Sequence, residues 1–155
     1  MANPETIRKT KLILAEGKDD FHFFCHACDF YRDDNDVQVM NFEGNDNLPN
    51  FLLDLTIMDG FDEVDTIVIA RDAETDAKAA AKSIQHSMKK ASIPEPQKPF
   101  EYIQNSSMKT AFIIFPGPEQ KNGKLEDLCL LTVNDDPIMQ CVDDYLECVK
   151  TNGEQ

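Results

Sequence analysis

The sequence predicts a single α/β domain built around a mainly parallel sheet of about four strands. Short apolar segments alternate with segments of helical periodicity along the 155 residues. The apolar segments are hydrophobic throughout, which is typical of parallel strands with both faces covered by helices. The chain contains no repeat and no linker long enough to divide it, so we expect one domain over residues 1–155.

The predicted strands are short apolar runs bounded by charged, glycine or proline residues. The third run is the clearest, because β-branched residues occupy positions 64 and 66–69. The four runs are Lys11–Ala15, Val37–Phe42, Val64–Ala70 and Ala111–Phe115.

Helical periodicity predicts helices between and after these strands. Asp19 or Asp20 is expected to cap the first helix, and Thr75 or Asp76 begins the third, which ends at the proline-rich segment 93–100. The predicted helices cover approximately 19–31, 48–58, 75–91, 125–131 and 136–150, with a polar loop over 31–36. The cysteines of the last two helices, Cys129, Cys141 and Cys148, are expected at buried positions.

Composition limits the possible partners and location. The formal net charge is −14, which opposes unaided binding to a phosphate backbone. No apolar run is long enough to cross a bilayer, and the N-terminal residues lack an apolar signal-peptide core, so a cytoplasmic protein without membrane contact is expected. The five cysteines are then expected to be reduced thiols.

Acidic residues follow three of the predicted strands. Glu16 follows the first, Asp72 and Glu74 follow the third, and Glu126 and Asp127 follow the fourth after a loop. Parallel sheets bind ligands at the carboxyl ends of their strands, so these acids are expected at one edge. Carboxylates that gather there need a hard cation such as Mg²⁺ or Mn²⁺, whereas carboxylates spread over a loop face need only water. The pattern alone leaves both interpretations open.

Four residues beside these acids also have predicted roles. Lys18 either contacts a substrate phosphate or is a solvated loop residue. Arg71 either binds substrate phosphate or pairs with a carboxylate, and the pairing is favoured. Gly17 and Gly123 are expected to serve a turn or a close backbone approach.

Two motifs resemble those of the Toprim domain found in topoisomerases, primases and several nucleases. The segment Glu16-Gly17-Lys18-Asp19-Asp20 is similar to its Glu-Gly-x-x-Asp motif, and Asp72-Ala73-Glu74 is similar to its Asp-x-Asp motif, with Glu in place of the second Asp. With "RDAETDAKAAAKSIQ" and "FIIFPGPEQKNGKLEDLCLLTV", residues 11–148 look like small standalone Toprim-like proteins of unknown function, related to the overcoming-lysogenization-defect nucleases. Such proteins often continue into a further helical segment, so this chain is expected to be a short member or to lack a terminal piece.

The resemblance implies a three-layer α/β/α, Rossmann-like fold and roles for the acids. Glu16 would be the general acid/base or a metal ligand, and Asp72 and Glu74 would hold Mg²⁺ or Mn²⁺. Glu126 and Asp127 match the later acid motif of the related nucleases. The implied reaction is phosphodiester hydrolysis or another phosphoryl transfer on nucleic acid. A non-catalytic metal-binding or protein-interaction module is the alternative.

Overall fold

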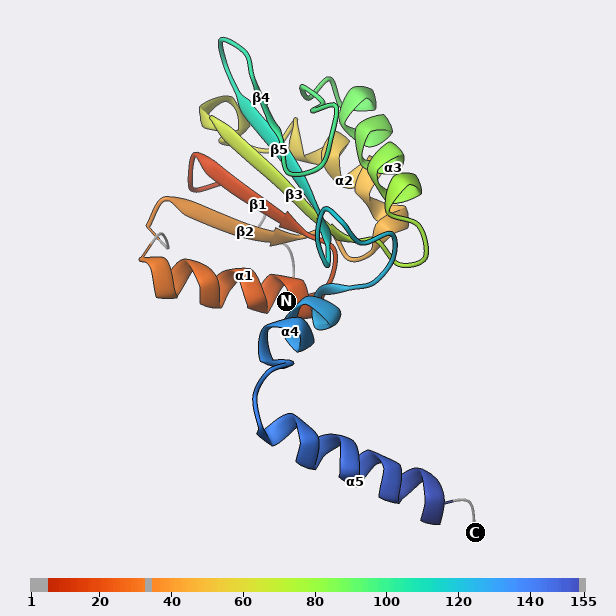
Figure 1. Ribbon diagram of the computed structural model, residues 1–155. Coiled ribbons are helices and arrows are strands. Elements are labelled where there is room, and N and C mark those ends of the chain that lie inside the picture. The colour runs from red at the N-terminus through yellow and green to blue at the C-terminus, as the bar shows by residue number, and fades with distance from the viewer. Residues whose placement is uncertain (1–5, 33–34, 154–155) are drawn as a thin grey trace.

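A five-stranded sheet forms the centre of the computed structural model, which describes residues 6–32 and 35–153 (Figure 1). The strand order is β2-β1-β3-β5-β4. The four parallel strands are β1 (Lys11–Ala15), β2 (Val37–Asn41), β3 (Thr66–Asp72) and β5 (Lys109–Phe115), and β4 (Tyr102–Gln104) runs antiparallel to β5 at one edge. The predicted fold class is therefore confirmed.

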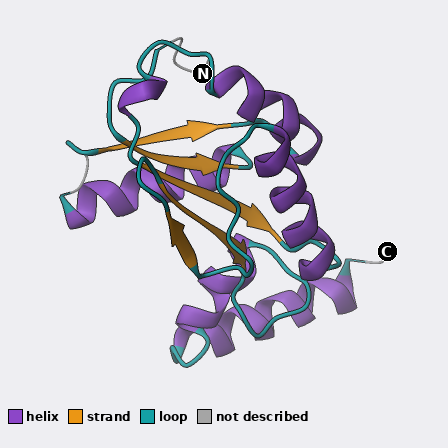
Figure 2. Ribbon diagram, turned by 90° about the horizontal axis from the view of Figure 1, so that it is seen from above, coloured by secondary structure: helices purple, strands orange, loops and turns teal. Residues whose placement is uncertain are grey.

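Helices cover both faces of this sheet (Figures 1 and 2). The first face carries α2 (Leu48–Leu55) and α3 (Ala77–Lys90), and the second carries α1 (Lys18–Tyr31) and α4 (Leu125–Val133). The last helix, α5 (Ile138–Asn152), extends away from the sheet in Figure 1. No helix in residues 6–32 and 35–153 combines the length and apolar character needed to cross a membrane.

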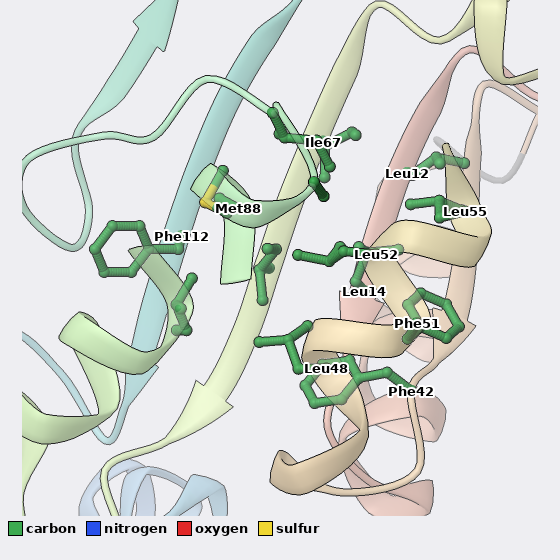
Figure 3. Packing of buried hydrophobic residues seen from close by; sticks show 14 of the residues in the cluster. Leu12, Leu14, Phe42, Leu48, Phe51, Leu52, Leu55, Ile67, Met88 and Phe112 are labelled. Carbon is green, nitrogen blue, oxygen red and sulfur yellow. The ribbon is translucent and has the colours of Figure 1, made fainter. Parts of the chain in front are cut away.

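The main hydrophobic core lies between the sheet and helices α2 and α3 (Figure 3). Strand residues Leu14, Ile67 and Phe112 are each 0–1% exposed, as are Leu52 of α2 and Met88 of α3. A smaller cluster on the second face joins Ala70 and Phe115 to Leu125 at the start of α4. Apolar packing therefore holds the carboxyl ends of β3 and β5 against the N-terminus of α4.

The structure differs from the predicted elements in ways that affect the site. The short strand β4 was missed, because three residues beside a proline-rich segment show no recognisable period. Strand β3 continues to Asp72, two residues beyond its predicted end, because Arg71 and Asp72 pair with Ile114 and Phe115 of β5. Part of the predicted loop at 31–36 lies outside the described residues.

The expectation that Cys129, Cys141 and Cys148 are buried is wrong. All three are exposed, whereas Cys28 of α1 is buried and Cys25 is partly buried. Helical spacing places apolar residues on one face of a helix, but only a packing partner buries that face. No residue of α5 is buried, so this helix lacks such a partner among the described residues.

Candidate functional site

An acidic pocket of about 410 Å³ opens at the carboxyl edge of the parallel strands. Its walls come from the ends of β1, β2 and β3 and from the N-termini of α1 and α4. The acidic residues that line it are Glu16, Asp19, Asp20, Glu43, Asp72, Glu74 and Glu126. Lys18 and Lys124 are the basic residues in the lining.

Glu16 lies where β1 ends and joins the neighbouring strand through its side chain. Its Oε2 accepts a hydrogen bond of 3.1 Å from the backbone N–H of Asp72. The Nε atom of Arg71 lies 3.7 Å from the same oxygen, and the Glu16 side chain is only 14% exposed. Burial raises the pKa of Glu16, although the Asp72 N–H and the Arg71 charge oppose this shift.

Asp72 is the most strongly perturbed acid of the pocket. Its Oδ1 accepts a 2.9 Å hydrogen bond from the N–H of Leu125, which ties the end of β3 to the first turn of α4. Burial, and next the charge of Asp20, raise the pKa of Asp72 to about 7. Near neutral pH this carboxyl group is therefore poised between its neutral and ionised forms.

Asp20 belongs to the same cluster, although the sequence suggested only a helix-capping role for it. One carboxylate oxygen, Oδ2, accepts a hydrogen bond of 3.2 Å from the Gly17 N–H. The other, Oδ1, is buried and has no hydrogen-bond partner in the described part of the chain, and the residue is 6% exposed. Burial raises the pKa of Asp20 as well. Asp20 reaches the pocket because it is the third residue of α1, whose first turn directly follows Glu16 and Gly17.

Glu74 and Lys124 form an ion pair at the mouth of the pocket. Lys124 Nζ lies 3.1 Å from Glu74 Oε1, and each side chain is 50% exposed. Glu74 has a positive φ of 52° and exchanges two backbone hydrogen bonds with Gly123, of 3.0 and 2.8 Å. This bridge fixes the loop before α4 against the end of β3, so that Lys124 reaches the acids. Sequence reasoning missed Lys124, because nothing in its neighbourhood distinguishes it from other loop lysines.

The predicted residues Asp127 and Arg71 lie outside the lining of the pocket. Asp127 Oδ2 accepts a 2.8 Å hydrogen bond from the Lys124 N–H, so this carboxylate caps α4. The Arg71 side chain is 7% exposed and lies beside Glu16. Its Nε and Nη1 atoms have no hydrogen-bond partner in residues 6–32 and 35–153. This geometry matches the favoured pairing with a carboxylate and gives Arg71 the position of a residue that orients Glu16.

The two glycines have different roles. Gly123 has a φ of +119°, and a Cβ there would lie 2.9 Å from both Pro116 Cδ and Asp127 Oδ2, so the turn requires glycine. Gly17 has an extended backbone (φ −135°) that any residue adopts. Its constraint is the close approach of Asp20 Oδ2, 3.3 Å from a built Cβ.

The carboxylates do not form a finished metal site. Among the described residues, no three histidine, cysteine, aspartate or glutamate side chains converge in an arrangement that could hold an ion. Backbone N–H groups hold Glu16 and Asp72, and Lys124 holds Glu74. A cation would have to draw these side chains inward, and the lack of a partner on Asp20 Oδ1 favours such a change.

The raised pKa of Asp72 predicts an unusual pH dependence of stability. The unfolded chain releases this proton near the ordinary pKa of 3.8, whereas the folded chain keeps it up to about 7. Ionisation of Asp72 therefore lowers the stability of the metal-free protein as pH rises between these two values. Asp72→Asn, which keeps the acceptor for Leu125 N–H, is expected to raise Tm near pH 8 and to have less effect near pH 4.

Thermal unfolding in EDTA across this pH range measures the effect. Asp62→Asn is the matched control, because Asp62 is exposed at the opposite edge of the sheet, before β3. If the difference in Tm between Asp72→Asn and wild type stays constant with pH, the pKa of Asp72 is not raised by folding.

The fold and the pocket define an α/β protein with an acidic site at the carboxyl edge of its parallel sheet. The chain belongs to a family of proteins of unknown function (DUF3226), whose model matches residues 10–155. No curated protein matches the sequence, and no solved structure matches the fold. This family has no assigned activity, so the acidic pocket is the feature that indicates a function.

Proposed function

We propose that this protein binds Mg²⁺ or Mn²⁺ in the acidic pocket and catalyses phosphodiester hydrolysis or another phosphoryl transfer on nucleic acid. The observation that carries the proposal is the crowding of Glu16, Asp20 and Asp72 in one half-buried pocket, where burial raises the pKa of all three. Such crowding is unfavourable without a compensating positive charge. Their oxygen atoms are the ligands that these hard cations prefer.

The pocket residues divide into three proposed roles. Asp72, Glu74 and Glu126 would hold the cation together with Asp20, and the cation would stabilise negative charge on the phosphate and lower the pKa of water. Glu16 would transfer the proton as general acid/base, with Arg71 and the Asp72 N–H fixing its carboxylate. Lys18 and Lys124 in the pocket lining would contact phosphate oxygens. The Toprim-like relationship and a cytoplasmic location are part of this proposal.

A non-catalytic metal-binding or protein-interaction module is the second candidate. Two observations favour it: the described acids do not converge into a finished site, and the net charge of −14 repels a polyanion. A basic protein partner would then have to bring nucleic acid to the pocket, or the site would serve binding alone.

Metal binding can be tested independently of catalysis. Mg²⁺ or Mn²⁺ is expected to raise Tm, because a ligand specific to the folded state stabilises it by about 2.7 kcal/mol at one hundred times Kd. The double change Asp72→Ala, Glu74→Ala is expected to abolish the metal-dependent part of this shift. Asp62→Ala is the control. A full shift in the double variant would place the cation elsewhere.

Catalysis is tested by a cleavage screen with Mg²⁺ and Mn²⁺ on single-stranded DNA, double-stranded DNA and RNA. We expect weak cleavage that falls further as salt rises, because charge repulsion makes substrate association poor. Bound Mn²⁺ without cleavage of any substrate would favour the non-catalytic module.

A further inference from the structure

Helix α5 presents an apolar face that the rest of the described chain leaves uncovered. Ile138, Val142, Tyr145 and Val149 repeat at the spacing of one helix face. Their exposed fractions are 64, 41, 67 and 47%. A contiguous exposed apolar face of this kind is typical of an interaction surface.

The apolar face continues into a groove between α4 and α5. This α4–α5 groove, of about 840 Å³, is formed by the two helices, the turn at 134–137 and the loop before α4. Its apolar lining includes Leu130 and Leu131 of α4 and Val142 and Leu146 of α5. These four residues are between 41 and 56% exposed. Two helices with apolar side chains along a shared groove make a recognised binding site for a third amphipathic helix.

The charge of the groove selects the chemistry of its occupant. The described residues that line it include four acids and no lysine or arginine. The acids are Asp127, Asp135, Asp136 and Asp143. Asp127 and Asp136 accept backbone hydrogen bonds at the starts of α4 and α5. Asp135 and Asp143 are exposed, and neither belongs to an ion pair among the described residues. An occupant with basic residues beside its apolar face would pack against the leucines and form ion pairs with the acids.

The same charges argue against other occupants. In a second copy of the chain, α5 would bring its own Asp143, Asp144 and Glu147 against only one basic residue, Lys150. Like charges would then face each other along the interface, in a molecule whose net charge is already −14. Nucleic acids and anionic membrane surfaces are repelled for the same reason.

We propose that the α4–α5 groove binds a basic amphipathic helix of a protein partner. Leucine-like side chains of that helix would fill the space between Leu131 and Val142, and its lysine or arginine residues would face Asp135 and Asp143. No described residue lines both the groove and the acidic pocket, so this binding is independent of the function proposed for the pocket.

A defined peptide tests the proposal on the full chain. The probe is a fluorescein-labelled peptide of about 18 leucine and lysine residues, with the leucines at helical spacing. Fluorescence anisotropy at physiological salt is expected to show saturable binding. A scrambled peptide of the same composition, which has the charge without the apolar face, is expected to bind at least tenfold more weakly. Equal binding by both peptides would reduce the interaction to charge alone and overturn the proposal.

Variants of the protein locate the site. The first double variant, Val142→Asp with Leu146→Asp, is expected to weaken binding of the probe at least tenfold. The second, Asp135→Asn with Asp143→Asn, is expected to weaken binding several-fold and to reduce its salt dependence. Ile57→Asp is the matched control, because Ile57 is 82% exposed but lies outside the groove. All these positions are partly or fully exposed, and circular dichroism with Tm verifies that each variant is folded.

Two further measurements separate the remaining outcomes. Hydrogen exchange with bound peptide is expected to show protection over 125–152, whereas protection confined to residues 16–20 or 72–74 would place the peptide in the acidic pocket and overturn the proposal. Light scattering without peptide is expected to show a monomer. If light scattering instead shows a dimer, and the double change Val142→Asp with Leu146→Asp dissociates it, then the groove binds a second copy of the chain.

Discussion

Glu16→Gln is expected to lower the rate of phosphodiester cleavage by about 10²- to 10⁴-fold, the usual cost of losing general acid–base assistance. Glutamine keeps an oxygen that accepts the hydrogen bond from the Asp72 N–H but removes the charge that faces Arg71, so circular dichroism and Tm first verify that the variant is folded. It has no carboxyl proton to exchange, so proton transfer is lost. The measurement is the initial cleavage rate at saturating Mn²⁺, on the best substrate from the screen.

The affinity for Mn²⁺ separates the two roles that remain open for Glu16. A general acid/base leaves Mn²⁺ affinity nearly unchanged, because Asp72 and Glu74 are still present, whereas a metal ligand makes affinity and rate fall together. Glu63→Gln is the matched control, because Glu63 is exposed before β3, at the opposite edge of the sheet. Full activity of Glu16→Gln would refute any catalytic role for Glu16.

Phe112→Ala is expected to lower the free energy of unfolding by about 3–5 kcal/mol, the typical cost of removing a buried aromatic side chain. Phe112 is 0% exposed on β5 and belongs to the main core with Met88 of α3 (Figure 3). Alanine leaves a cavity between the sheet and α3 that close packing prevents from collapsing fully. Urea unfolding followed by circular dichroism gives the difference in free energy.

Ile57→Ala is the control for this experiment, because its apolar side chain is 82% exposed and its loss should change the free energy by less than about 0.5 kcal/mol. Equal effects of the two changes would contradict the placement of Phe112 in the core. A change in the slope of free energy against urea would indicate an altered unfolded state instead.

Several features of the molecule could be predicted from local sequence. Apolar runs such as Lys11–Ala15 and the periodicity of 77–91 led to the correct fold class, because strands and helices impose different repeats on buried residues. The positions of Glu16, Asp72, Glu74 and Glu126 after their strands predicted a shared edge, and all four line the acidic pocket. Their chemical roles stay predictions.

Other features depend on contacts between distant segments. Asp127 follows Glu126 directly, yet one side chain caps α4 while the other lines the pocket, because adjacent residues of a helix point in different directions. Cys141 and Cys148 are exposed because no described segment packs against α5, which its local sequence does not reveal. Their spacing identifies an apolar face, but its burial depends on whether another surface reaches it.

The sequence by itself determined the α/β architecture and the edge of the sheet to which the acids would come, because periodicity and strand ends are local properties. Only the tertiary structure decided that Asp20 joins these acids, that Arg71 lies beside Glu16 and that Lys124 reaches Glu74. It also decided that burial would raise the pKa of Asp72 to about 7. These properties depend on which charges and apolar groups surround a side chain in space, and segments fifty or more residues apart supply many of these groups.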